Sequence, residues 1–151
     1  MKGFYHLTDT IKTELEKDVF VNTVTYGDIF DIDLNKQTIY PLSHFIVNSG
    51  TYEGNVWRFN ISLLCMDIVD FSKEDTTDEF KGNNNEHDVL NTQLAVINRL
   101  LEQLRRGDLR DTLYHLDGTP SVEPFTDRFE MGVAGWTVTF DVLIANDMTI
   151  C

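Results

Sequence analysis

Three closely spaced aspartates are the first residues of this chain that could do chemistry. Asp28, Asp31 and Asp33 lie in the stretch GDIFDIDLNK, which covers residues 27–36. A calcium loop needs oxygen ligands at alternate positions, a tight glycine turn and a distal bidentate carboxylate. The stretch has no glycine or glutamate at those distances, and apolar residues are interleaved with the acids. We therefore expect a solvated or interfacial edge and no metal site.

The histidines are the next candidates, and their spacing is not that of a known motif. His6, His44, His87 and His115 are scattered, and no pair has the spacing of zinc ligands. A G-x-S-x-G nucleophile elbow is also missing from the sequence. The pattern favours structural or exposed histidines. One alternative stays open: a small cytosolic hydrolase or deaminase whose site is assembled in space from His44, Asp67 and His87.

The charge balance excludes a class of partners. Against 25 Asp and Glu the chain has 12 Lys and Arg, which gives a net charge of −13. Affinity for nucleic acid comes largely from Lys and Arg that displace counterions from phosphates. We therefore expect no binding to duplex DNA and no adhesion to anionic lipid. A surface this acidic could instead line a passage through which DNA moves without sticking.

Cysteine usage and the chain ends suggest a reducing compartment. Cys65 lies in an apolar run and Cys151 is the last residue, so no disulfide framework is expected. The first ten residues contain no apolar signal-peptide core, and no apolar run approaches about 18 residues. Cytoplasmic synthesis and no membrane span are the expectations.

Periodicity predicts two helices and five strands. The helices have apolar residues three or four apart, on the stripes Phe4, Leu7, Ile11, Leu15 and Leu90, Leu94, Ile97, Leu101, Leu104. The first helix should end near Asp18, and the second should run from an N-cap at Asp88 to Gly107. The strands are expected at residues 19–26, 42–48, 55–67, 121–131 and 135–144.

The two longest predicted strands each have one apolar side. In residues 57–65 every second residue is apolar, while Arg58, Asn60 and Ser62 face the other way. The order α-β-β-β-α-β-β predicts an α+β fold, with a mixed, mainly antiparallel sheet and two helices packed on one face. At 151 residues the chain is expected to be a single domain, residues 1–151.

A long polar segment separates the third strand from the second helix. Residues 71–88 are polar except for their first residue and Phe80. Loops of this length are uncommon in compact domains unless they have a function. We expect Ser72–Asn85 to reach a neighbouring subunit, with Phe80 as its anchor and Lys81 beside it. Arg105 and Arg106, at the end of the second helix, are the other expected interface residues.

Three passages of the chain resemble small structural proteins of tailed bacteriophages, including crAss-like and related phages. They are VNTVTYGDIFDIDLNKQTIYPLSHFIVN, NEHDVLNTQLAVINRLLEQLRRGDL and PFTDRFEMGVAGWTVTFDVLIANDMTIC. Together with the element order, they are similar to the tail terminator and tail completion proteins. In that family one helix and a mixed sheet precede a long helix and a final strand pair.

The resemblance implies a structural role. The expected assembly is a homo-oligomeric ring of six or twelve subunits that caps the tail tube and joins it to the head. Its partners would be neighbouring neck and tail proteins, and DNA would pass through without specific binding. The protein would be made in the host cytoplasm and located in the virion. The family has no catalytic motif, so the resemblance implies no enzyme, cofactor or active-site residue. A monomeric adaptor is the remaining alternative.

Overall fold

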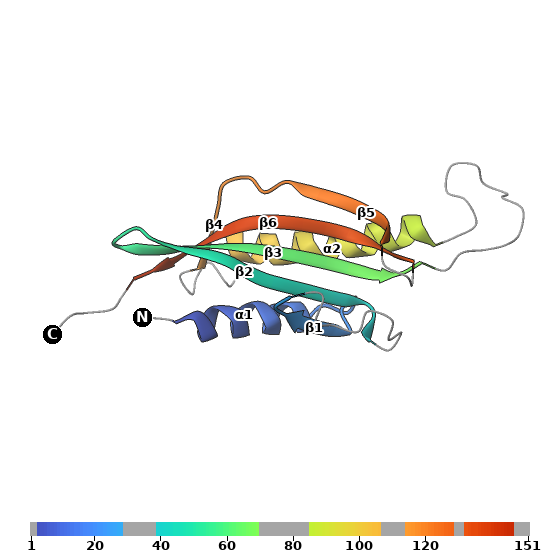
Figure 1. Cartoon of the computed structure of the whole chain (residues 1–151), viewed down its shortest axis with the longest axis horizontal. Helices are drawn as coiled ribbons and strands as arrows, with labels where there is room; N and C mark the ends of the chain where they lie inside the picture. Colours follow the sequence, from blue (N-terminus) through green and yellow to red (C-terminus); the bar gives the residue numbers. More distant parts are fainter. Residues whose placement is uncertain (1–2, 29–38, 70–84, 107–113, 129–131, 147–151) are drawn as a thin grey trace, which may run out of the picture.

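The computed structural model describes residues 3–28, 39–69, 85–106, 114–128 and 132–146. These ranges form two helices and six strands (Figure 1): α1 (Phe4–Glu16), β1 (Thr23–Tyr26), β2 (Leu42–Tyr52), β3 (Val56–Ile68), α2 (Glu86–Arg106), β4 (Tyr114–Asp117), β5 (Val122–Arg128) and β6 (Val133–Ala145). The predicted α+β class and element order are confirmed. The short strand β4, inserted before the closing pair, was not predicted.

The strands form one mixed sheet. Its order is β1-β2-β3-β6, and both β4 and β5 pair with the outer side of β6. Only β1 and β2 run parallel; the other described pairs are antiparallel. The longest ladder joins β3 to β6 from Val56↔Ala145 to Ile68↔Val133. These two strands are the centre of the sheet, and the side chains on their two faces define the surfaces described below.

The β2–β3 hairpin is longer than expected. β2 begins directly after Pro41, as predicted, but continues to Tyr52 instead of ending at Asn48. The register shifts between Val47 and Ser49, so Asn48 lies in a β-bulge that lets the strand continue. The turn contains Gly54 at a φ of 80°, a backbone conformation that glycine adopts readily.

Both helices pack on the same face of the sheet, as predicted. The main core joins α1 (Leu7, Ile11, Leu15) and the buried side of α2 to alternate residues of β3 and β6. The strand residues of this core are Ile61, Leu63, Cys65, Val138, Phe140, Val142 and Ile144. We call this side of the sheet the covered face.

Three predicted details of the helices are wrong. Phe4 does not enter the core; it is 42% exposed, at the end of α1. The buried side of α2 is rotated from the leucine stripe: the buried residues are Val89, Gln93, Val96, Ile97, Leu100 and Leu104. Leu94 is exposed. α2 also begins before Asp88, at Glu86, and the N–H of Val89 donates to the carbonyl of Asn85 at 2.9 Å. Contact with the sheet therefore decides which side of the helix is buried, and Val89, Val96 and Leu100 lie on that side although they are outside the predicted stripe.

A buried carboxylate joins the two helices. Glu14 on α1 is 6% exposed, and its Oε1 accepts a hydrogen bond from Lys17 Nζ at 2.8 Å. Arg99 on α2 donates to the Glu14 main-chain oxygen at 2.6 Å and lies 3.4 Å from Glu14 Oε2. The guanidinium thereby fixes the spacing of the helices. Of the helices that the structure describes, neither is long and apolar enough to cross a membrane.

The opposite face of the sheet, which we call the open face, is apolar at one end only. There a second cluster contains Tyr40, Leu42, Met66, Phe125 and Val133. The other end of this face, toward the β2–β3 turn, is polar and is covered by neither helix.

Candidate functional site

The predicted interface residues are only partly described. Phe80 and Lys81 lie outside the described residues, so their role stays a prediction. Arg105 and Arg106 are exposed and form the last turn of α2, as expected. Arg106 Nε pairs with Glu102 one turn earlier. Arginine near a helix C-terminus interacts favourably with the helix dipole, which accounts for both residues.

The aspartate stretch is also only partly described. Asp28 is exposed, directly after Gly27 at the end of β1, while Asp31 and Asp33 lie outside the described residues. Among the described residues, no three His, Cys, Asp or Glu side chains are grouped so that they could hold a metal ion. The absence of a metal site at the three aspartates stays a prediction.

His44 is a buried structural histidine. It is 2% exposed, and both ring nitrogens have partners: Nδ1 lies 2.8 Å from Thr25 Oγ1 and Nε2 lies 2.6 Å from the Gly27 carbonyl oxygen. A carbonyl only accepts hydrogen bonds, so Nε2 carries the proton. Burial lowers the pKa of His44, opposed by the Gly27 hydrogen bond and by the charge of Asp28. The neutral ring ties β2 to the end of β1.

The structure does not assemble the predicted hydrolase site. His44 pairs with Leu64, while Asp67 lies on the same side of β3 as Cys65, so the two side chains are on opposite faces of the sheet. Burial raises the pKa of Asp67, opposed by a hydrogen bond from the Ile68 N–H to its carboxylate. His87 is exposed, at the second residue of α2. His44 and Asp67 therefore cannot act as one catalytic pair.

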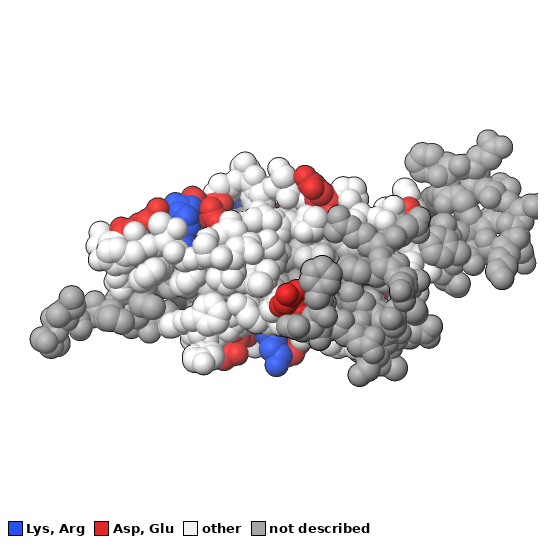
Figure 2. Space-filling view, viewed as in Figure 1, with Lys and Arg blue, Asp and Glu red and all other residues white. Residues whose placement is uncertain are grey.

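An ion cluster lies at the polar end of the open face, near the β2–β3 turn. Arg58 Nε lies 3.2 Å from Glu53 Oε1, and its Nη1 pairs with Asp117 and lies 3.5 Å from Asp141 Oδ2. The hydrogen bonds to Asp117 and Glu53 raise the pKa of Arg58 above its usual range. Figure 2 shows basic atoms flanked by acidic ones at this end of the molecule. Three carboxylates share one guanidinium, so the cluster is acidic.

Hydrogen bonds continue this cluster across three strands. Asn60 Nδ2 donates to Asp141 Oδ1 at 2.8 Å, and Asn48 Nδ2 donates to Asn60 Oδ1 at 2.9 Å. Asn48 also lies 2.7 Å from Ser62 Oγ, which is 3.2 Å from Thr139 Oγ1. The bulge in β2 brings Asn48 to this face. We call the surface formed by the ion cluster and this network the polar face.

A hollow deepens the polar face beside β4. It measures about 200 Å³ and is lined by residues that include Asp117, Thr139 and Asp141. The alternation in residues 57–65 predicted that Asn60 lies on the side opposite the apolar residues. It did not predict Asp117, because strand β4 was not recognised. The positive-φ Gly118 directly after it is the turn signal that could have located this strand.

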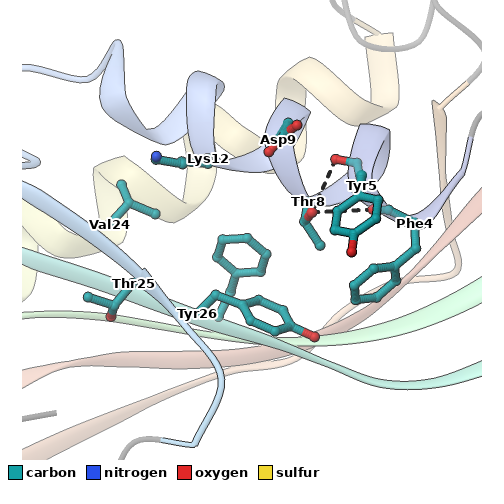
Figure 3. A pocket seen from close by; sticks show the side chains of 9 residues that line it. Phe4, Tyr5, Thr8, Asp9, Lys12, Val24, Thr25 and Tyr26 are labelled. Carbon is teal, nitrogen blue, oxygen red and sulfur yellow. Dashed lines mark hydrogen bonds between the residues drawn. The ribbon is translucent and has the colours of Figure 1, made fainter. Parts of the chain in front are cut away.

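A second surface is an aromatic groove between α1 and β1. The groove measures about 400 Å³. Its walls are Phe4, Tyr5, Thr8, Asp9 and Lys12 of α1, Val24, Thr25 and Tyr26 of β1, and Phe45 of β2. In Figure 3 Phe4 and Tyr26 point toward one another from the two walls; their ring centroids are 6.1 Å apart. Tyr26 also meets Phe45 edge to face at 5.2 Å.

The groove contains part of the exposed apolar surface. Seven large hydrophobic residues are exposed in the described part of the chain, and three of them, Phe4, Tyr5 and Tyr26, line the groove. Clustered exposed apolar residues mark contact surfaces more often than isolated ones do. Sequence reasoning missed this surface because it placed Phe4 in the core.

Comparison with known proteins adds no family to these observations. No protein-family model and no curated protein matches the chain in sequence.

Proposed function

We propose that this chain is a structural virion protein, a subunit of a tail-terminator-like ring that joins the tail tube of a phage to the head-proximal connector. The polar face is the observation that carries the proposal. The resemblance stated from the sequence supplies the kind of assembly, and the polar face supplies a surface suited to it. DNA passes through the ring, and neighbouring neck and tail proteins lie above and below it.

The polar face suits a passage for DNA because it holds no cation free to grip phosphate. Arg58, its central cation, is shared by Glu53, Asp117 and Asp141. The amides of Asn48 and Asn60 already donate to oxygens of their neighbours. Tight DNA binding requires Lys and Arg that displace counterions, and here carboxylates outnumber guanidinium three to one. DNA would slide past such a surface.

No observation favours the hydrolase alternative. Both nitrogens of His44 are engaged within the fold, and Asp67 lies on the other face of the sheet. A monomeric adaptor remains the competitor, and assembly state separates the two.

The direct test of the ring is the shape and mass of the purified full chain. Mass photometry and light scattering over a concentration series should give a closed oligomer of constant mass, and negative-stain images should show annular particles. A monomer at every concentration, with no annular particles, would support the adaptor and remove the ring.

The second test concerns DNA. The protein should not bind a labelled duplex in fluorescence polarisation at about 150 mM salt, because non-specific binders reach Kd values near 10⁻⁴–10⁻⁶ M through basic contacts that the polar face does not offer. Micromolar or tighter binding that weakens steeply with salt would contradict an acidic, non-gripping passage.

A further inference from the structure

We propose that two copies of this chain pair through the outer edge of β2, antiparallel and around a twofold axis at Thr51. The contact extends the sheet of one copy into the next through hydrogen bonds between main chains. It goes beyond the proposed ring, because a twofold contact closes with two copies and cannot build a ring by itself. Added to a ring of six subunits, such a contact would join two rings.

The outer edge of β2 is bare toward the β2–β3 turn. β2 pairs with β3 along its length, but on its other side β1 covers only Leu42–Phe45. Among the described residues, no strand pairs with that side of β2 after Phe45, so seven residues, 46–52, form a bare edge. In Figure 1 this end of the hairpin projects past the start of α1. The main-chain N–H and C=O groups of such an edge are a template for a strand of another chain.

The bare edge lacks the charges that usually protect a strand edge. Natural edge strands are blunted by charged side chains, lysine above all, or by proline. Residues 46–52 contain neither, although 25% of the chain is charged. A bulge at Asn48 also disturbs the edge, but regular pairing with β3 resumes at Ser49, and every residue from there to Tyr52 is exposed. Two copies with a net charge of −13 repel one another, so an uncharged edge is a favourable place for them to meet.

The main-chain groups of Gly50 and Tyr52 point outward from this edge. The N–H of Glu53 donates to the carbonyl of Val56 at 3.0 Å, so the main chain of Glu53 is turned toward β3. Successive residues of an antiparallel strand turn these groups to opposite sides. Thr51 therefore directs its N–H and C=O toward β3, while Tyr52 and Gly50 present theirs at the bare edge.

A twofold axis at Thr51 uses all of these outward groups. It places Gly50 of one copy opposite Tyr52 of the other, and the two residues exchange both N–H···O=C bonds. The same exchange occurs on the other side of the axis, which gives four hydrogen bonds, two for each pair. An axis at Gly50 or at Tyr52 would leave one pair opposite the bulge or the turn. With the axis at Thr51, the second copy's turn, residues 53–55, lies opposite residues 47–49 and does not reach β1.

The side chains also fit this register. Tyr52 is 65% exposed and lies beside Trp57, with ring centroids 5.4 Å apart. Across the axis it meets Gly50 of the other copy, which has no side chain to obstruct it. The ring of Phe59 lies against this glycine, since a Cβ there would be 3.0 Å from it. Tyrosine from one copy and phenylalanine from the other thus cover the glycine, and aromatic pairs across strands stabilise a sheet.

Disulfide cross-linking tests the pairing and its register. Thr51→Cys, combined with Cys151→Ser, places two cysteines opposite one another on the axis. Cα atoms in such a non-hydrogen-bonded pair are about 4.5 Å apart, within the range that a disulfide spans. Cys65 stays in place because it is fully buried. Mild oxidation of the full chain should convert most of it to a disulfide-linked dimer.

Ser49→Cys in the same background is the matched control. Ser49 is exposed on the same edge. Its two copies lie four residues apart along the paired strands, about 13 Å, which is too far for a disulfide. This variant should give at most a tenth of the dimer that Thr51→Cys gives. Equal yields from the two variants would overturn the inference.

Charge exchange on the axis provides the second arm. Thr51→Lys alone, or Thr51→Glu alone, places like charges opposite one another and should weaken association about tenfold or more. An equimolar mixture of the two variants should associate within about threefold of the wild type, because each lysine then faces a glutamate. Asn98→Lys and Asn98→Glu, at an exposed position of α2, should leave association unchanged. Sedimentation velocity measures all of these. A mixture that associates no better than either Thr51 variant alone would contradict the twofold pairing.

The outcomes separate this inference from the proposed function. A preferred Thr51→Cys dimer in a protein that forms no annular particles would support the edge contact and count against the ring. Annular particles whose mass is the same in Thr51→Lys, without a preferred cross-link, would overturn the edge contact and leave the ring in place. A wild-type monomer without a preferred cross-link would overturn both.

Discussion

The two faces of strands β3 and β6 are formed by alternate residues of the same two strands, but their environments are opposite. On the covered face, Ile61, Leu63 and Val142 have no exposed surface because both helices lie over them. On the polar face, Asn60 and Ser62 alternate along β3 with Ile61 and Leu63. Both form hydrogen bonds with Asn48, and Ser62 also lies within hydrogen-bond distance of Thr139. The difference shows that stability and contact chemistry are divided between the two sides of one sheet.

The division has an energetic basis. Burying a large aliphatic side chain contributes about 1.5–3 kcal/mol, while a hydrogen bond that replaces a bond to water contributes about 0.5–1.5 kcal/mol. The covered face therefore supplies most of the free energy of folding. Residues of the polar face are free to serve another purpose, because changing them costs the fold little.

The largest effect is expected from Leu63→Ala, on the covered face. Leu63 is 0% exposed, so its truncation removes buried methyl groups and leaves a cavity. We expect a loss of about 2–5 kcal/mol in the free energy of unfolding. The neighbouring Ser62→Ala, on the polar face, should cost less than about 1 kcal/mol. Urea denaturation measures both, and similar losses would remove the contrast between the faces.

Gly135→Ala, on the open face, should produce the next largest loss of stability. Gly135 lies opposite Met66, where a Cβ would come within 2.0 Å of the Cys65 carbonyl oxygen and 2.8 Å of Met66 Cα. The backbones of β3 and β6 must separate to admit it, at a cost of about 1–3 kcal/mol or more. Gly3→Ala is the control, because nothing lies within 4 Å of its Cβ position. Equal stability of the two variants would show that the strands can move apart.

A smaller effect is expected from pH, through the histidine that holds β1 to β2. Burial lowers the pKa of His44 below 6.5, so the unfolded chain binds this proton more readily than the folded one. The contribution of His44 is fully present above pH 6.5 and is lost as the pH falls below 6.5 through the folded-state pKa. Unfolding free energies between about pH 8 and 5 should therefore fall less steeply in His44→Gln than in the wild type. An equally steep fall in His44→Gln and in the wild type would contradict this role of His44.

The smallest effect, none at all, is expected from divalent ions. The interleaved apolar residues around Asp28, Asp31 and Asp33 do not match a calcium loop. The melting temperature should be the same in millimolar calcium, in millimolar magnesium and with a chelator. A reproducible rise of several degrees with one ion would contradict this expectation and give the aspartate stretch a chemical role.

Much of the fold could be predicted from the sequence, and the failures have identifiable causes. Strict alternation from Trp57 to Cys65 predicted the covered face of β3, because a strand places successive side chains on opposite sides. The same logic placed Arg58 and Asn60 on the open side. It failed for Phe4 and for the leucine stripe of α2, where local spacing fits several helix rotations that differ only in long-range contacts. β4 was missed because four residues carry too little periodicity.

The sequence by itself determined the α+β class, the alternation of the central strands and the acidic charge. These depend on local backbone geometry and on composition, which need no knowledge of distant residues. Only the tertiary structure decided that Asp117 joins Arg58, that His44 and Asp67 lie on opposite faces, and that Phe4 and Tyr26 form two walls of one groove. Each of these depends on strand order and register, which are fixed by the burial of residues far apart in the chain.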